Sequence, residues 1–204
     1  MSDNKFITWI QNYFKKKDFN GKIIRQSTTG FSGKDYFEKG FKYYKESAFI
    51  EGEGWQQKKK KLDQLAIECF DNALKKGYET SKLFALRADC LDYLGYHFNA
   101  IEDYNKALSM NPTEGVANGY WRRAMIKHTI FDFEGSRNDI ITAITLSQND
   151  NEDNRYWNEH AKSIGFNTST ELYKWDLEWI VERSLKHPPD LNKKEEVLKN
   201  IKRR

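Results

Sequence analysis

Residues 81–113 read SKLFALRADCLDYLGYHFNAIEDYNKALSMNPT, and this stretch decides the expected fold. Its apolar side chains recur at spacings of three and four residues, pause at Gly95 and resume until Pro112. Such spacing is typical of amphipathic helices, and glycine and proline mark their ends. The stretch therefore predicts two helices joined by a tight turn. The positions that would let two antiparallel helices approach closely are the small residues Ala88, Ala100 and Ala107.

The same pattern recurs on both sides of this stretch. The residues that lie 34 positions before Ala100, Tyr104 and Ala107 are Ala66, Phe70 and Ala73. The residues that lie 36 positions after Ala88 and Ala107 are Ala124 and Ala143. A period of this length predicts an array of stacked helical pairs, in which each pair buries its apolar face against its neighbours. We expect three consecutive units, residues 34–80, 81–116 and 117–147.

Residues 81–113 resemble the tetratricopeptide repeat family. The family's pattern of aromatic, small, apolar and proline positions is filled by Phe84, Ala88, Leu91, Ala100, Tyr104, Ala107 and Pro112. One position departs from the pattern, because Arg87 stands where the family prefers leucine. The resemblance covers residues 34–147 and is sharpest in residues 81–113. It implies an all-α, right-handed superhelical array of antiparallel helix pairs, a solenoid of about three repeats.

The first unit and the two ends of the chain depart from the repeat pattern. In the first unit, about 14 extra residues separate its two predicted helices, residues 34–51 and 60–75. Residues 1–33 are expected to form an amphipathic helix and a loop, and the apolar face of this helix consists of Phe6, Ile7, Trp9, Ile10, Tyr13 and Phe14. A solenoid needs end caps. We therefore expect two capping helices, 155–164 and 169–186, within residues 148–189, followed by a basic tail at 190–204.

Composition excludes several classes of protein. Aromatic residues make up 15% of the 204-residue chain, which argues against global disorder because disordered chains are poor in them. The net charge of +4 arises from mixed signs along the chain, so charge does not single out nucleic acid as a partner. No apolar run is long enough for a membrane helix. Two cysteines without a metal-binding spacing fit a reducing compartment, so we expect a cytoplasmic protein.

No catalytic, cofactor or metal site is predicted. Residues 27–35, STTGFSGKD, resemble a phosphate-binding loop only faintly, because Asp35 occupies the place of the hydroxyl residue that binds Mg²⁺. The composition of this segment instead favours a loop that leads into the first repeat helix. The four histidines are scattered singly, and Cys69 and Cys90 fall at core positions of helices. We therefore expect a protein that is not an enzyme.

The repeat resemblance implies a ligand groove on the concave side of the array, where the first helix of each unit contributes its exposed side chains. The groove residues that it implies are Phe37, Phe41, Tyr44, Lys82, Asp89, Asp92, Tyr93, Asn118, Trp121, Arg122, Met125 and His128. Aromatic side chains provide anchoring area at interfaces, and the guanidinium of Arg122 suits a carboxylate. An alternative is that several of these residues pack against residues 1–33 instead of an external partner.

Two functions remain open from the sequence. The first is a non-catalytic adaptor or scaffold that binds a protein or peptide in the groove. The second is a peripheral binder of anionic surfaces, either nucleic acid or membrane, through the lysine run 58–61, the basic tail and the N-terminal aromatic helix. The sequence favours protein–protein interaction, because a charge run is usually a solvated face and one short helix binds membranes weakly.

Overall fold

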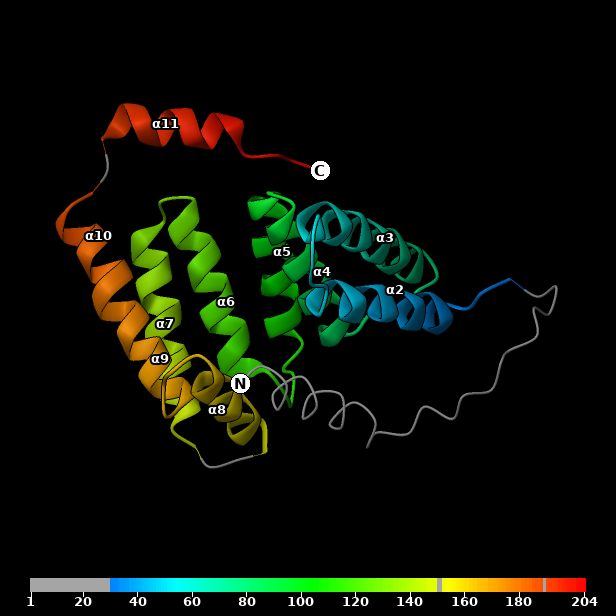
Figure 1. The fold of residues 1–204 in the computed structure, drawn as a ribbon, viewed down its shortest axis with the longest axis horizontal. Helices are drawn as coiled ribbons and strands as arrows, with labels where there is room; N and C mark the ends of the chain where they lie inside the picture. Colours follow the sequence, from blue (N-terminus) through cyan, green and yellow to red (C-terminus); the bar gives the residue numbers. More distant parts are fainter. Residues whose placement is uncertain (1–29, 150–151, 189) are drawn as a thin grey trace.

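The structure, a computed structural model, describes residues 30–149, 152–188 and 190–204. Within these ranges all regular structure is helical, and successive helices pack in adjacent pairs (Figure 1). The predicted helix in residues 1–33 falls largely on positions outside the described residues. The first six described helices are α2 (Gly33–Ala48), α3 (Trp55–Lys75), α4 (Ser81–Tyr93), α5 (His97–Ser109), α6 (Val116–Thr129) and α7 (Phe133–Ser147).

Local sequence signals set where the helices begin. At α2, the hydroxyl of Ser32 accepts from the backbone N–H of Asp35, and the Asp35 carboxylate accepts from the backbone N–H of Ser32 at 2.8 Å. This reciprocal capping box satisfies two donors of the first turn. The bonds from Ser32 also lower the pKa of the Asp35 carboxyl. The aspartate that breaks the phosphate-loop pattern therefore serves as a helix-start residue.

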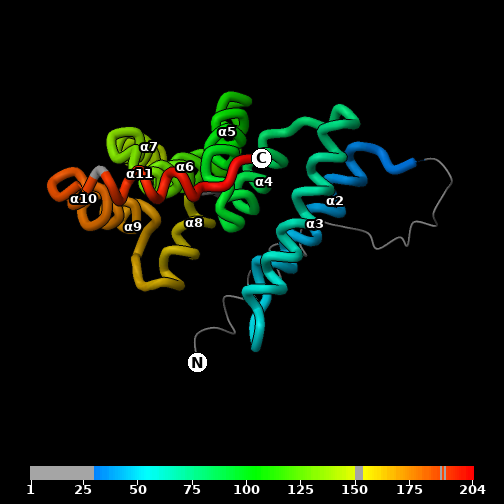
Figure 2. The backbone as a smooth tube through the Cα atoms, turned by 90° about the horizontal axis from the view of Figure 1, so that it is seen from above, coloured from blue at the N-terminus to red at the C-terminus, as the bar shows by residue number. Residues whose placement is uncertain are grey.

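The first helical pair differs from expectation in length. Helix α2 ends at Ala48, before the expected end at residue 51, and α3 begins at Trp55 rather than near residue 60. Residues 55–59 consequently lengthen α3, which reaches 21 residues, and residues 49–54 form the connection between the two helices. Figure 2 shows α2 and α3 as a long hairpin that projects from the remaining helices.

Two hydrophobic cores hold the helices together. The first contains Phe70, Ala88 and Ala100 from α3, α4 and α5, and the second contains Ala124, Ile140 and Tyr173 from α6, α7 and the C-terminal helices. Helix α6 belongs to both cores, because Ile126 packs in the first one. The alanines expected at the close helix contacts are fully or nearly fully buried.

Gly40 marks the closest approach of α2 and α3. A Cβ atom added at this position would lie 2.8 Å from the ring of Phe70 and 3.1 Å from the carbonyl oxygen of Ala66. Gly40→Val is therefore expected to lower the free energy of unfolding by about 1–3 kcal/mol through overpacking. Urea denaturation followed by circular dichroism measures this loss. The control is Gly119→Ala, whose new Cβ meets only the flexible end of Leu108, and an equal loss there would contradict the prediction.

The remaining helices cover one end of the array. Helix α8 (Glu152–Ser163) is followed by α9 (Ser169–Asp176), η1 (Leu177–Glu182) and α10 (Arg183–Lys186). The last three form one continuous helix, which spans the same residues as the second expected capping helix, 169–186. Its middle turns are π-helical. None of the described helices is long and apolar enough to cross a bilayer.

Helix α11 (Leu191–Asn200) occupies part of the expected basic tail. Figures 1 and 2 both show it crossing the ends of α7 and α6, with residues 201–204 returning to α4 and α5. None of the residues described as buried in the two cores comes from α11. Its partly buried residues are Lys194, Val197 and Leu198, so this helix lies on the surface of the array without entering a core.

Candidate functional site

A groove of about 650 Å³ lies between the repeat helices and α8. This volume falls within the range of ligand sites in proteins. Helices α2, α4, α5, α6 and α8 supply the walls, and the segment 112–115 supplies part of the rim. Its principal lining side chains are Phe41, Tyr44, Lys82, Leu86, Asp89, Tyr104, Asn118, Arg122, Tyr156, Trp157 and His160.

Asp89 organises the polar part of this groove. Its carboxylate accepts hydrogen bonds from the hydroxyl of Tyr44 at 2.9 Å and from the hydroxyl of Tyr104. The guanidinium of Arg122 lies 3.8 Å from the same carboxylate. Burial, together with the negative charge of Asp89, raises the pKa of both phenols, and the same charge raises the pKa of Arg122. At neutral pH both phenols therefore stay neutral and Arg122 stays charged beside the Asp89 side chain.

Two nitrogen donors in the groove have no hydrogen-bond partner among the described residues, Arg122 Nε and Trp157 Nε1. The Arg122 side chain nevertheless keeps 40% of its surface exposed, so a molecule in the groove can reach it. A buried donor without a partner is costly. Both nitrogen atoms are themselves shielded, so a carboxylate or carbonyl oxygen in the groove would reach them only after the two side chains turn toward it.

The twelve residues implied by the repeat resemblance divide into two groups in the structure. Those that line the groove are Phe41, Tyr44, Lys82, Asp89, Asn118 and Arg122. Those that lie elsewhere are Phe37, Asp92, Tyr93, Trp121, Met125 and His128. Phe37 packs against the first core, Asp92 lies 2.7 Å from His97, and Tyr93 lies beneath the ammonium of Lys59.

The C-terminal helices explain why half of α6 is unavailable to the groove. The indole N–H of Trp121 donates to Asp176 at 2.6 Å, and its ring stacks on Tyr173 with centroids 5.6 Å apart. Met125 packs against the same second core, and His128 Nε2 lies 2.8 Å from the hydroxyl of Ser184. These three residues therefore join α6 to the continuous helix at 169–186.

Sequence reasoning missed two features of the site. The first is the contribution of α8, because nothing in the spacing of Trp157 and His160 indicates that this helix returns to the groove. The second is a ladder of polar contacts between repeats. Arg87 donates to Asp103 through two bonds of 2.7 Å and to Asp71 through a third of 2.7 Å.

The ladder repeats one unit later, with Asn105 in the place of Asp71. Arg123 donates to Asp139 at 2.7 and 2.8 Å and to Asn105 at 2.7 Å. Arg87 and Arg123 are 36 residues apart, as are Asp103 and Asp139. The arginine that departs from the family pattern is thus a repeated contact between adjacent helical pairs. A signal was present in the sequence, since each arginine precedes an aspartate by 16 residues.

Comparisons with protein-family models, curated proteins and solved structures give no match to this chain. In the part of the chain that the structure describes, no three His, Cys, Asp or Glu side chains are grouped to hold a metal ion.

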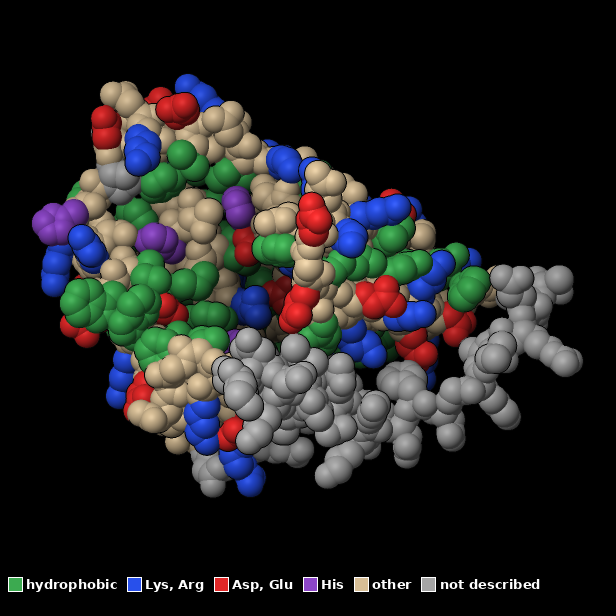
Figure 3. All heavy atoms as spheres, in the orientation of Figure 1, with side chains coloured by type: hydrophobic (Ala, Val, Ile, Leu, Met, Phe, Trp, Pro, Cys, Tyr) green, Lys and Arg blue, Asp and Glu red, His purple; other side chains and the backbone are tan. Residues whose placement is uncertain are grey.

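Hydrophobic side chains also gather on the surface over α9 and α10 (Figure 3). The exposed tryptophans of this region are Trp175 and Trp179. The groove is therefore the site that the geometry defines best.

Two partly buried histidines make stability depend on pH. Burial and the charge of Arg122 lower the pKa of His160, and burial lowers the pKa of His128. The unfolded chain consequently binds more protons than the folded chain just below the ordinary histidine pKa of about 6.5. We expect the free energy of unfolding to fall as the pH drops from 7 to 5, with at most about 1.4 kcal/mol per pH unit from each histidine.

Replacement of the histidines tests this dependence. Denaturant unfolding of His160→Asn should show a flatter pH profile between 5 and 7 than the unchanged chain. His187→Asn, which removes an exposed histidine, serves as the control. A profile that His160→Asn leaves unaltered would contradict the assignment of the slope to the buried ring.

Proposed function

We propose that this protein is a non-catalytic adaptor of the tetratricopeptide repeat type, whose groove binds a segment of another protein. The observation that carries the proposal is the groove of about 650 Å³, in which aromatic walls surround the Asp89–Arg122 pair. Aromatic side chains and arginine are the residues most enriched at binding hot spots. The helical pairs and the periodic Arg–Asp ladder support a repeat array with the right-handed superhelical arrangement of that family.

The chemistry of the groove suggests what the partner segment offers. Asp89 already accepts two hydrogen bonds, whereas two buried donors lack a partner in the described part of the groove. A segment with one or two aromatic or branched apolar side chains and an adjacent carboxylate or carbonyl would complement both features. Arginine binds carboxylates through paired N–H donors, so Arg122 is the expected contact.

The alternative of an anionic-surface binder has less support. Within the lysine run, Lys59 turns inward, where its ammonium lies 3.1 Å from the buried Asp63. In the basic tail, Lys202 and Arg204 contact the backbone of Leu94 and the side chain of Asp71. These contacts reduce the positive charge that is available to phosphates, and they favour the groove as the binding surface.

A peptide selection followed by titration calorimetry tests the proposal. A random peptide library is panned against the full chain, and the selected peptides are titrated into Arg122→Ala and Leu86→Glu. We expect both substitutions to weaken binding at least tenfold, because one removes the cation and the other places a charge on the apolar wall. Arg137→Ala, which removes an exposed arginine outside the groove, should leave binding unchanged.

The titrations also distinguish the two functions. Equal affinity for the unchanged chain and Leu86→Glu would place the selected peptides outside the groove and would contradict the proposal. Loss of affinity with rising salt, with no effect of Leu86→Glu, would instead support the anionic-surface alternative, since phosphate contacts depend steeply on salt.

A further inference from the structure

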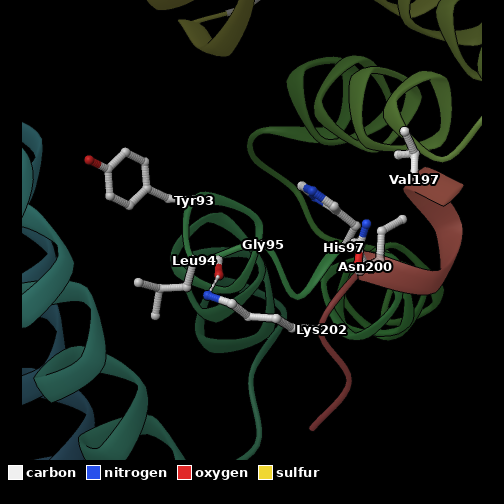
Figure 4. A pocket seen from close by; sticks show the side chains of 8 residues that line it. Tyr93, Leu94, Gly95, His97, Val197, Asn200 and Lys202 are labelled. Carbon is white, nitrogen blue, oxygen red and sulfur yellow. Dashed lines mark hydrogen bonds between the residues drawn. The ribbon is translucent and has the colours of Figure 1, made fainter.

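Residues 202–204 contact a surface that lies about a hundred positions earlier in the chain. The ammonium of Lys202 donates to the backbone carbonyl of Leu94 at 2.9 Å, at the end of α4. Figure 4 shows this bond, with Lys202 extending from the end of α11 toward the turn at Gly95. A cavity of about 370 Å³ lies beside it, with His97, Val197 and Asn200 on one side and Tyr93 and Leu94 on the other.

The surface formed by α3, α4 and α5 contacts both the side chains and the main chain of residues 202–204. Lys202 lies 5.5 Å from the ring centre of Tyr96, and the guanidinium of Arg203 lies 4.2 Å from that of Phe98. The amide of Asn99 accepts from the backbone N–H of Arg204 at 2.9 Å and donates to its carbonyl at 3.4 Å. The guanidinium of Arg204 also donates to the carboxylate of Asp71.

These contacts form a set that suits an extended basic segment. The carbonyl end of a helix attracts cations, and the last turn of α4 contains no basic residue of its own. Aromatic rings bind ammonium and guanidinium groups through their faces. An asparagine side chain offers one donor and one acceptor, which matches the two polar groups of a peptide main chain. Asp71 adds a carboxylate for arginine.

The segment is held at the surface and is therefore exchangeable. Lys202, Arg203 and Arg204 remain exposed, and no described residue of α11 is buried. Exposed ion pairs contribute little individually. Residues 202–204 nevertheless tend to occupy this surface because they belong to the same chain. A short connection gives them an effective concentration at the surface on the order of 1 mM.

We propose that Asp71, Leu94, Tyr96, Phe98 and Asn99, here called the Asn99 surface, form a binding site for an extended basic peptide segment. Residues 202–204 occupy this site within the chain, and a Lys-Arg-Arg segment of a partner protein exchanges with them. Exchange releases the attachment of α11 at its C-terminal end. The proposal does not depend on the groove, since none of these residues lines it.

Competition between the chain's own segment and an added peptide tests the proposal. The probe is a fluorescein-labelled, amidated peptide with the sequence of residues 198–204, Leu-Lys-Asn-Ile-Lys-Arg-Arg. It is titrated by fluorescence anisotropy into the unchanged full chain and into the released variant, Lys202→Ala/Arg203→Ala/Arg204→Ala. For a peptide Kd of about 0.1 mM, an effective concentration of about 1 mM predicts roughly tenfold tighter apparent binding to the released variant.

Three controls separate the Asn99 surface from general attraction between charges. Lys193→Ala/Lys194→Ala/Lys199→Ala removes the same charge from α11 outside the contact, and it should bind the peptide as weakly as the unchanged chain. Asn99→Ala in the released variant should weaken peptide binding at least fivefold, because the main-chain contacts are lost. A peptide of the same composition in shuffled order should also bind more weakly.

The opposite results would overturn the proposal. These are equal affinity of the unchanged chain and the released variant, or an affinity that Asn99→Ala leaves unaltered. Hydrogen exchange gives a readout without added peptide. Amide exchange in α11 should accelerate in the released variant and remain unchanged in the Lys193/Lys194/Lys199 control.

Discussion

Arg87→Ala is expected to lower the free energy of unfolding by about 3 kcal/mol, because it leaves the buried Asp103 carboxylate without its cation and removes one of the two cations at Asp71. The Arg87 side chain is 17% exposed and that of Asp103 is 8% exposed, so water does not replace the lost contacts. Burial raises the pKa of Asp103, and Arg87 opposes this rise. Urea unfolding at pH 7, followed by circular dichroism, measures the loss.

Two companion variants define the cause of this loss. Arg137→Ala breaks an exposed pair with Glu182 and should cost less than about 1 kcal/mol. Arg87→Met/Asp103→Leu should recover much of the stability lost in Arg87→Ala, since removing both charges of a buried pair is often neutral. The deficit of Arg87→Ala should also narrow as the pH falls, because protonation removes the uncompensated charge of Asp103. A double variant no more stable than Arg87→Ala would refute the explanation by buried charge.

Trp121→Ala is expected to cost about 3–5 kcal/mol, the usual loss for truncating a large aromatic side chain in a core. The repeat resemblance implies that Trp121 faces a ligand, whereas the structure packs it on Tyr173 and bonds it to Asp176. Asp176 is buried, and burial raises its pKa while the bond from Trp121 lowers it. Thermal and urea unfolding both report the loss.

Neighbouring substitutions distinguish packing from ligand binding at this point of α6. Trp121→Phe retains much of the apolar area but leaves the Asp176 carboxylate without the indole donor, which should cost about 1–3 kcal/mol. Trp121→Phe/Asp176→Leu should restore part of that loss. Arg122→Ala, one residue along, should affect stability less and peptide binding more. If the Trp121→Ala chain remained stable but bound the peptide weakly, Trp121 would act in ligand binding rather than in packing.

The local sequence predicts the helical pairs, but it does not predict how helices that are distant in the sequence pack together. Ala88, Ala100 and Ala107 indicate close helix contacts because small side chains at helical spacing have few other roles, and all three are buried. The repeat resemblance, in contrast, implies that particular positions spread along the first helix of each pair face the groove. It fails for Met125 and His128, because the C-terminal helices occupy that face of α6.

The lengths of α2 and α3 illustrate a second limit. The sequence contains the extra residues, but the helical spacing alone does not divide them between loop and helix. Gly52 and Gly54, which adopt positive φ angles, fix the turn just before Trp55. The groove contribution of Trp157 depends on how α8 folds back on the array, which no repeat pattern encodes.

The return of residues 202–204 to α4 and α5 also bears on how this chain unfolds. Repeat arrays contain mostly contacts between sequence neighbours, so they fray from an end in small steps. Here Arg204 connects to Asp71 and, through it, to Arg87 and Asp103, which links the last helix to the first core. Loosening α11 therefore also removes contacts on α3, α4 and α5, so fraying at the C-terminal end is not independent of the opposite half of the array.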